Sequence, residues 1–224
     1  MKKPLISVII RTKNNAETIA RALDSTLKQT LSQNKFEIII VNDGSRDTTI
    51  QKIKPYSEQI NYHETSNLGA VQALNFGLEK ATGKYYTILD ADDALSHKAL
   101  EQLLNKIQDT GASVVYGNYF EISESSQQKL LVDTSKNLFL SIAGGILFEK
   151  DIVLTCNKYD KSLFFPEYDL LIKIMKKYKI AHLNLPVYYY FRRQGSLTSS
   201  KDRVQSGINE LRKKYNQDFP IRSY

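Results

Sequence analysis

The N-terminal half of the chain alternates short, β-branched apolar runs with amphipathic segments, and this alternation restricts the fold more than any other feature. Apolar residues at helical spacing predict helices over residues 16–31, 70–81 and 98–110, the first with Asn15 as its N-cap. Strands that alternate with helices form a mostly parallel α/β sheet with helices on both faces. The predicted strands are residues 5–11 (LISVIIR), 36–41 (FEIIIV), 60–64 (INYHE) and 85–89 (YYTIL).

The C-terminal half has a different pattern, which predicts a smaller region with antiparallel pairing. Residues 112–122 and 129–133 flank a polar turn and predict a hairpin. Residues 181–192 predict a strand in which Pro186 marks an edge or a break. A polar helix is expected near the C-terminus. A helix over 167–178 is predicted to bury Leu170, Leu171, Ile174 and Met175.

The chain is basic, and most of the basic excess is C-terminal. Its 224 residues carry a net charge of +7, from 31 basic and 24 acidic side chains. Two interpretations stay open: a solvated basic face, or a surface that lies against anionic lipid headgroups. No apolar run approaches the ~18–20 residues of a membrane span. The apolar run before Arg11 lacks a small-residue cleavage site after it. We therefore expect a cytoplasmic protein.

Polar residues gather in the loops that follow the predicted strands. These loops should lie along one edge of the sheet, where parallel α/β sheets bind their ligands. Neither a G-x-G-x-x-G nor a P-loop pattern is present, so the usual dinucleotide and triphosphate fingerprints are missing. The four loops are residues 12–15, 42–47, 65–69 and 90–93.

Three carboxylates, Asp90, Asp92 and Asp93, follow directly on a strand that reads as buried. In one explanation, Asp92 or Asp93 caps the next helix, which leaves Asp90 unexplained. In the other, carboxylates two residues apart hold Mg²⁺ or Mn²⁺ loosely and leave positions for phosphate oxygens. The spacing favours the cation. Asp43 is a turn residue by itself, but its place at the same edge favours a polar ligand.

Four segments together resemble glycosyltransferase family 2. They are SVIIRTKNNAETIARALDSTLKQT, EIIIVNDGSRDTT, NLGAVQALNFGLEKATGKYYTILDADD and PEYDLLIKI, and the resemblance covers roughly residues 5–195. It implies the A-type glycosyltransferase fold, a mostly parallel Rossmann-like sheet flanked by helices with a smaller acceptor-side subregion. We expect a single domain with three parts: a nucleotide-sugar-binding half (1–93), an acceptor and catalytic half (94–198), and a basic C-terminal helix or tail (199–224).

The resemblance also implies roles for individual donor-side residues. Asp43 looks like the carboxylate that reads the nucleobase, and Thr12 and Asn14 would border the base and ribose. Asp90-Ala91-Asp92 resembles the D-x-D motif, with Asp90 near the ribose and metal and Asp92 as a ligand of Mn²⁺ or Mg²⁺. The sequence departs from the pattern at its first loop, where Arg11 stands in place of a frequent Pro and Lys13 in place of a frequent Tyr.

Inversion at the anomeric carbon requires a general base for the acceptor hydroxyl. The family places this base in an acidic pair that opens a helix, and here Glu167 takes its position. Asp169 is the alternative, and residues two apart on a helix point about 200° apart, so only one can face the site. Arg193 resembles a residue that could contact the diphosphate from a lid.

The sequence therefore predicts a metal-dependent, hexosyltransferase-type inverting enzyme. It would move one sugar from a nucleoside-diphosphate sugar, with a UDP-sugar favoured, to a glycan or lipid-linked hydroxyl in bacterial cell-surface polysaccharide or lipopolysaccharide biosynthesis. Peripheral contact with an anionic membrane stays one of the two open interpretations of the basic excess, and a nucleic-acid partner is not expected. One alternative is a nucleotidyltransferase-like enzyme, but IIRTKNNAE lacks the glycine of a triphosphate-binding loop. The other is a non-catalytic basic binding module, which the acidic ligand edge disfavours.

Overall fold

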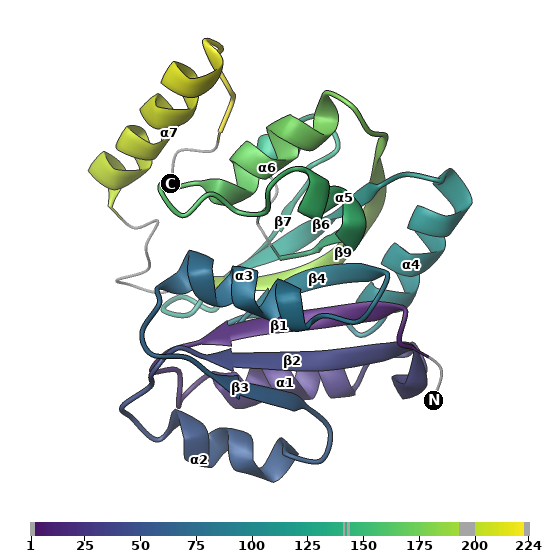
Figure 1. Cartoon of the computed structure of the whole chain (residues 1–224), viewed down its shortest axis with the longest axis vertical. Coiled ribbons are helices and arrows are strands. Elements are labelled where there is room, and N and C mark those ends of the chain that lie inside the picture. Colours follow the sequence, from purple (N-terminus) through teal and green to yellow (C-terminus); the bar gives the residue numbers. More distant parts are fainter. Residues whose placement is uncertain (1–2, 141, 143, 193–199, 222–224) are drawn as a thin grey trace.

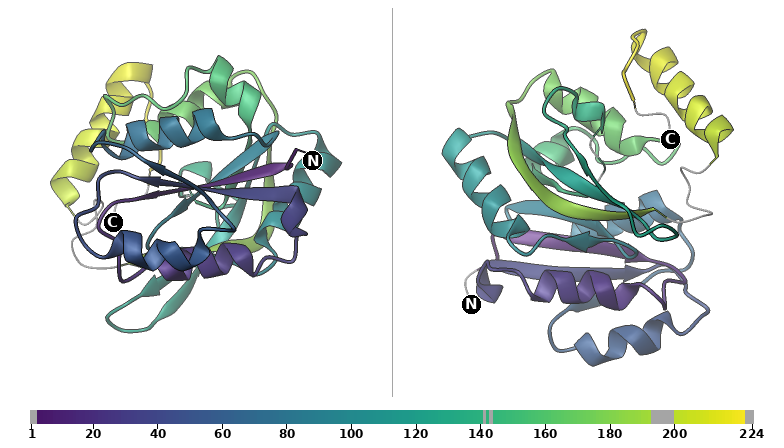
Figure 2. Two further views of the ribbon diagram at one scale, coloured as in Figure 1. Left: turned by 60° about the horizontal axis from the view of Figure 1, so that its bottom comes forward. Right: turned by 180° about the vertical axis from the view of Figure 1, so that it is seen from behind.

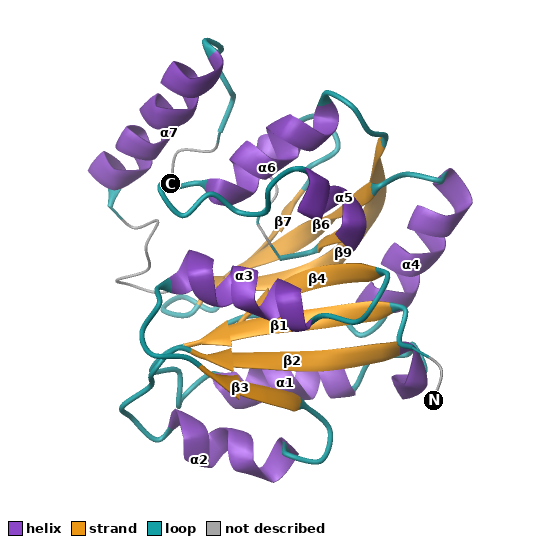
Figure 3. Ribbon diagram, in the orientation of Figure 1, coloured by secondary structure: helices purple, strands orange, loops and turns teal. Residues whose placement is uncertain are grey.

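The computed structural model describes residues 3–140, 142, 144–192 and 200–221. Within these residues one 9-stranded sheet runs through the molecule in the order β3-β2-β1-β4-β8-β6-β9-β5, and β7 pairs with β6 off this path (Figures 1 and 3). The strands are β1 Ile6–Thr12, β2 Phe36–Asn42, β3 Asn61–Glu64, β4 Tyr85–Asp90, β5 Ala94–Leu95, β6 Val114–Ser123, β7 Lys129–Val132, β8 Ile146–Glu149 and β9 Ile180–Arg192.

The first four strands pair in parallel, as their apolar runs predict. β2 and β1 are buried almost along their whole length, because helices cover both faces of the sheet. The register places Arg11 of β1 beside Asp90 of β4, and Thr12 beside Asn42 of β2. Consequently the loops after these strands all leave the sheet at the same edge, as expected.

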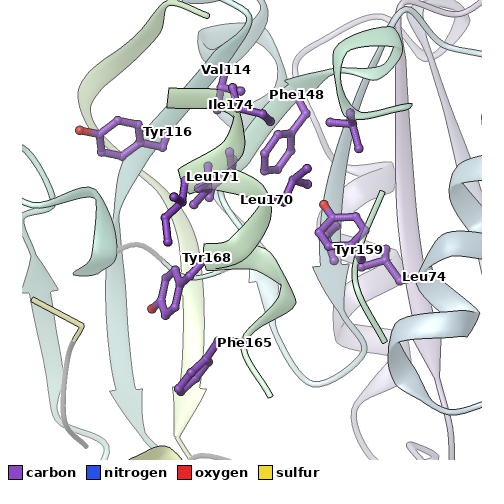
Figure 4. Close-up of a cluster of buried hydrophobic side chains, with 14 of the residues drawn as sticks. Leu74, Val114, Tyr116, Phe148, Tyr159, Phe165, Tyr168, Leu170, Leu171 and Ile174 are labelled. Carbon is purple, nitrogen blue, oxygen red and sulfur yellow. The ribbon is translucent and has the colours of Figure 1, made fainter. Parts of the chain in front are cut away.

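Helices form a layer on each face of the sheet (Figure 2). One apolar cluster joins the sheet to α1, α2 and α4, and a second joins its other face to α3, α5, α6 and α7. The second cluster extends to the part of the sheet that contains β6 and β8. There Leu170, Leu171 and Ile174 of α6 lie near Val114 and Phe148 (Figure 4). The helices are α1 Ile19–Leu27, α2 Thr49–Ile53, α3 Ala70–Lys80, α4 Ala99–Thr110, α5 Lys150–Thr155, α6 Pro166–Met175 and α7 Lys201–Tyr215, with short 3₁₀ turns at Gln33–Lys35, Lys54–Tyr56 and Leu138–Leu140.

The first helix begins later than the sequence predicts, and Asn15 is not its N-cap. Thr18 takes the N-cap position, because the side chain of Asn15 is used within its own loop. Its Oδ1 accepts hydrogen bonds from the Lys13 N–H at 3.1 Å and from the Thr12 hydroxyl at 3.2 Å. Asn15 therefore closes the turn after β1 and does not cap α1.

The C-terminal half follows the predicted hairpin with two differences. Residues 114–123 and 129–132 pair antiparallel as expected. The prediction that Met175 faces inward is wrong: it ends α6 and its exposed fraction is 48%. The pairing of β9 with β6 shifts register next to Pro186, because proline cannot donate to the ladder, so the proline marks a break inside a paired strand.

The two predicted halves share one sheet. β4, which ends the donor-side half, pairs antiparallel with β8 of the acceptor-side half. None of the described helices is long and apolar enough to cross a membrane.

Candidate functional site

Thr12 and Asn14 lie at the edge where the strands end, and they connect the first loop to the second. The Asn14 N–H donates to Ser45 Oγ at 2.9 Å, and Asn14 Oδ1 accepts from the Arg46 N–H at 2.8 Å. Asn14 adopts a positive φ of 54°, a conformation that asparagine tolerates better than most residues. The two loops are therefore hydrogen-bonded to each other beside the end of β1.

Asp43 is buried and organises the third loop. Its Oδ1 accepts from the Thr65 hydroxyl at 2.7 Å and the Leu68 N–H at 2.6 Å, and its Oδ2 accepts from the Gly69 N–H at 2.8 Å. Burial opposes ionisation, but these hydrogen bonds outweigh it and hold the pKa of Asp43 below its usual range. Asp43 thus fixes the entry to α3, and its predicted contact with a nucleobase stays a prediction.

Asp90 and Asp92 lie at the end of β4, where the D-x-D pattern places them. Asp90 Oδ1 is 3.2 Å from Arg11 Nε, and the Asp90 side chain keeps 32% of its surface exposed. The Asp92 carbonyl oxygen accepts a hydrogen bond from Arg21 of α1. Carboxylate oxygens are suitable ligands for Mg²⁺ or Mn²⁺. Among the described residues, no group of three or more His, Cys, Asp or Glu side chains converges that could hold a metal ion, and a cation at Asp90 and Asp92 stays a prediction.

Asp93 is the buried member of the cluster, and it does not cap a helix. The next helix, α4, has Lys98 at its N-cap position, so the capping explanation is wrong for Asp93. Asp93 accepts from the Tyr188 hydroxyl and from the Phe191 N–H, both at 2.8 Å. Burial and the neighbouring carboxylates of Asp90 and Asp92 raise its pKa well above the usual range. Asp93 therefore ties the D-x-D loop to β9.

The hydroxyl of Tyr188 connects two residues of the D-x-D loop, Asp90 and Asp93. Nothing in the sequence indicated this role of Tyr188. Its hydroxyl donates to Asp93 and accepts from the Asp90 N–H at 3.2 Å. Its ring is fully buried and fills the space beside Gly144, where a Cβ would lie 2.1 Å from the ring. No local pattern marks this role, because Tyr188 lies 98 residues from Asp90 in the chain.

We expect Tyr188→Phe to destabilise the fold by about 1–3 kcal/mol. The ring still fills its space, but Asp93 loses a donor while it stays buried, and an unsatisfied buried acceptor costs about that amount. Urea unfolding of the wild type and the variant measures the difference. Tyr189→Phe serves as the control, since Tyr189 is only partly buried. Equal midpoints for wild type and Tyr188→Phe would contradict the assigned role.

Glu167 and Asp169 lie in the first turn of α6, and the structure gives them different surroundings. Glu167 Oε1 is 3.9 Å from Arg11 Nη2, on the side of the strand ends, and its side chain is 17% exposed. Burial raises the pKa of Glu167, and the nearby Arg11 opposes this shift. Asp169 is fully buried against α7, where its carboxylate meets Lys173 Nζ at 2.6 Å, Lys214 Nζ at 2.8 Å and the Tyr215 hydroxyl at 2.6 Å.

The structure therefore brings Asp90 and Glu167 to one guanidinium, that of Arg11. Asp169 faces the other way, and its Oδ1 contacts Lys214 and Tyr215 of α7. Arg193 lies outside the described residues. In the sequence, Arg11 stands out only as a departure from the family pattern in the first loop. Its partners, 79 residues away on β4 and further still on α6, are visible only in three dimensions.

A comparison with models of protein families assigns most of this chain to one family. The model that matches residues 7–165 is described as glycosyl transferase family 2. It spans the first three loops and the D-x-D motif and ends next to Pro166, where α6 begins. The chain belongs to glycosyltransferase family 2. It is thus a glycosyltransferase, as the four sequence segments predicted.

Two curated relatives are also named as glycosyltransferases, and their sequences are 31% and 38% identical to this chain over the aligned residues. An uncharacterised glycosyltransferase of Haemophilus influenzae is 31% identical over 218 residues, which are 93% of this chain and 86% of the relative. Glycosyltransferase GlyG of Streptococcus pneumoniae is 38% identical over 125 residues, which are 54% of this chain. That second alignment covers only 41% of GlyG, so the chain corresponds to a part of that longer protein.

Solved structures confirm the A-type glycosyltransferase fold. The mannosyltransferase PcManGT from Pyrobaculum calidifontis, in complex with GDP-Man and Mn²⁺, superposes with a TM-score of 0.77 at 16% identity. That match covers 99% of this chain and 67% of PcManGT. S. aureus TarS in complex with UDP-GlcNAc gives 0.73 at 21% identity, over 91% of this chain and 64% of that one.

Proposed function

We propose that this family 2 enzyme transfers one sugar, with inversion, from a nucleoside-diphosphate sugar to a hydroxyl group. The observation that carries the proposal is the meeting of Asp90 from β4 and Glu167 from α6 at Arg11. Asp90 and Asp92 would hold Mn²⁺ or Mg²⁺, and Glu167 would act as the general base. When bound, the cation screens the negative charge of the diphosphate leaving group.

In the proposed reaction, Glu167 takes the proton of the acceptor hydroxyl as its oxygen bonds to the anomeric carbon. The bond from that carbon to the diphosphate oxygen breaks, and its electron pair leaves with the nucleoside diphosphate. A base works best when its pKa lies near the working pH, and the burial that raises the pKa of Glu167 moves it in that direction. Asp169 is unsuited to this task, because Lys173, Lys214 and Tyr215 surround its carboxylate.

The donor class is supported by the bound molecules of the structural neighbours. PcManGT was solved with GDP-Man and Mn²⁺, and TarS with UDP-GlcNAc and with UDP. Both are complexes with a nucleoside diphosphate or its sugar, which agrees with a D-x-D motif at the end of β4 in this chain. We propose a UDP-sugar as the favoured donor.

For the acceptor, we propose a glycan or lipid-linked hydroxyl in bacterial cell-surface polysaccharide or lipopolysaccharide biosynthesis. Some of the basic side chains that suggested a membrane surface have other partners in the structure. Lys214 pairs with Asp160 at 3.1 Å and with Asp169, and Arg212 pairs with Asp218 at 2.7 Å. Contact with anionic lipid would therefore depend on the other C-terminal lysines, such as Lys176 and Lys177.

The first test is thermal unfolding with UDP, GDP, dTDP and CDP, each with Mn²⁺ and then with EDTA. A ligand at about 100 times its Kd adds about 2.7 kcal/mol of stability, which corresponds to several degrees in a chain of this size. We expect one diphosphate to raise Tm with Mn²⁺ only, and Asp92→Ala to abolish that rise.

The control for this test is Asp109→Ala, which removes an exposed carboxylate of α4 outside the site. It should keep the full metal-dependent rise in Tm. If no diphosphate shifts Tm in the wild type, the proposed donor site is wrong. A rise that EDTA leaves unchanged would contradict the proposed metal alone.

A further inference from the structure

Arg11 lies where the donor side and the acceptor side of the site meet. It is the second-last residue of β1, and only 19% of its side chain is exposed, so its charge is largely shielded from water. Its Nε contacts Asp90 Oδ1 at 3.2 Å, and its Nη2 faces Glu167 Oε1 at 3.9 Å. The third nitrogen, Nη1, is 3.5 Å from the Ala70 carbonyl oxygen at the start of α3. One guanidinium thereby connects β1, β4, α3 and α6.

The distance between Arg11 Nη2 and Glu167 Oε1 is short enough for the guanidinium to stabilise the charged carboxylate, but it is too long for a hydrogen bond. A direct hydrogen bond would occupy the carboxylate oxygen that has to receive a proton. At 3.9 Å the guanidinium still favours the ionised carboxylate, because the surroundings are poor in water. This distance therefore suits a base that must stay both charged and available.

Apart from Arg11, burial and Asp90 favour the neutral form of Glu167, and only a backbone N–H at the start of α6 also favours the ionised form. Burial disfavours a charge there, and the carboxylate of Asp90 on β4 repels it. The phenols of Tyr86 on β4 and Tyr159 before α6 hydrogen-bond to each other at 2.7 Å, and burial raises the pKa of both, so neither brings a charge. Arg11 supplies the positive charge that opposes these effects.

We propose that Arg11 is a positioning residue for sugar transfer: it holds Glu167 ionised and oriented beside Asp90, at the junction of the donor and acceptor sides. The inference rests on the proposed role of Glu167 as the base. It makes Arg11 necessary for the proton transfer and not for binding of the nucleotide. A fork-shaped guanidinium can contact two carboxylates at once, which a lysine ammonium does less well.

The first measurement follows the Glu167 carboxyl in the full-length, ligand-free chain. Glutamate labelled with ¹³C at the carboxyl carbon is titrated by NMR, and the signal lost in Glu167→Gln identifies Glu167. We expect a higher titration midpoint in Arg11→Met, a partial return in Arg11→Lys, and no change in Arg203→Met, which removes an exposed arginine of α7. An unchanged midpoint in Arg11→Met overturns the inference.

The second measurement is the release of nucleoside diphosphate from UDP-GlcNAc or GDP-mannose, whichever the wild type hydrolyses faster. Arg11→Met should lower kcat by about tenfold, less than the 10²–10⁴-fold that a positioned general base contributes, because Glu167 itself remains, and it should leave KM for the donor within about threefold. The acid limb of the pH profile should move to higher pH. A raised KM with unchanged kcat would instead make Arg11 a donor-binding residue and overturn the inference.

Glu167→Gln separates this inference from the proposed function. If Glu167→Gln keeps the wild-type rate, the base assignment fails, and the inference fails with it. If Glu167→Gln is inactive while Arg11→Met matches the wild type in rate and pH profile, the inference alone is wrong. Should Arg11→Met not fold, Arg11→Lys and Arg11→Gln decide by the same two measurements.

Discussion

Glu167→Gln is expected to lower the rate of sugar transfer by about 10²–10⁴-fold, the range that a positioned general base contributes. Glutamine keeps the size of the side chain and its place opposite Arg11, but it cannot accept the acceptor proton. Binding of the diphosphate should persist, because Asp90 and Asp92 are unchanged. The measurement pairs the rate of diphosphate release with the metal-dependent rise in Tm.

Two further variants sharpen this expectation. Glu58→Gln removes an exposed carboxylate outside the site and should leave the rate unchanged. Glu167→Asp keeps the carboxylate but withdraws it by one methylene, so an intermediate rate is expected. A Glu167→Gln enzyme with wild-type turnover would contradict the assignment, and Asp169 would not inherit the role, since its carboxylate faces α7.

The stability of the same variant provides a check that needs no donor. Because burial raises the pKa of Glu167, the unfolded chain ionises this group more readily than the folded chain. Glu167 therefore lowers the free energy of unfolding as pH rises through its folded pKa. The wild type should lose stability as pH rises from the pKa of an unfolded glutamate, about 4.3, towards the raised folded value, and Glu167→Gln should lose less over that range. Parallel pH curves for the two proteins would argue against a raised pKa.

The sequence was sufficient for features that depend on local pattern and topology. Buried β-branched runs predicted the parallel strands, and the rule that ligands bind at the carboxyl ends of strands predicted where Asp43 and Asp90 would lie. The choice of Glu167 over Asp169 followed from a family resemblance and the pitch of a helix. The structure agrees that the two side chains face different partners.

Features that depend on distant contacts were out of reach. Nothing in the segment around Tyr188 shows that its hydroxyl joins Asp90 to Asp93, because the partners lie more than 90 residues apart. Similarly, the sequence around Arg11 indicates no partner for its side chain. Only the fold brings Glu167 of α6 next to it. Asn15 had a suitable side chain for an N-cap, but the tight turn after β1 used that side chain first.

Asp169→Ala is expected to destabilise the protein by about 2–4 kcal/mol. The wild-type carboxylate is fully buried, forms ion pairs with Lys173 and Lys214 and accepts a hydrogen bond from Tyr215, and a hydrogen bond to a charged group contributes about 1.5–3 kcal/mol. The loss should be less than the sum, because the two lysines keep 28% and 33% of their side chains exposed and can turn to water. Thermal unfolding should show a fall in Tm of roughly 10 °C, and Asp109→Ala should show almost none.

The pH dependence of this loss distinguishes an ion-pair network from simple packing. Burial opposes ionisation of Asp169, but its three donors outweigh burial and lower its pKa. The stabilisation is therefore complete above the pKa of an unfolded aspartate, about 3.9, and disappears as pH falls through the lower folded value. The difference in stability between wild type and Asp169→Ala should stay constant from pH 8 to pH 5 and shrink in more acidic solution.

Since Asp169 fixes α7 to the helix that carries Glu167, the variant should also lose turnover while the donor side keeps its metal-dependent rise in Tm. A difference in stability that is independent of pH down to pH 2 would mean that Asp169 contributes through packing, and a lost rise in Tm would mean that α7 also supports the donor side.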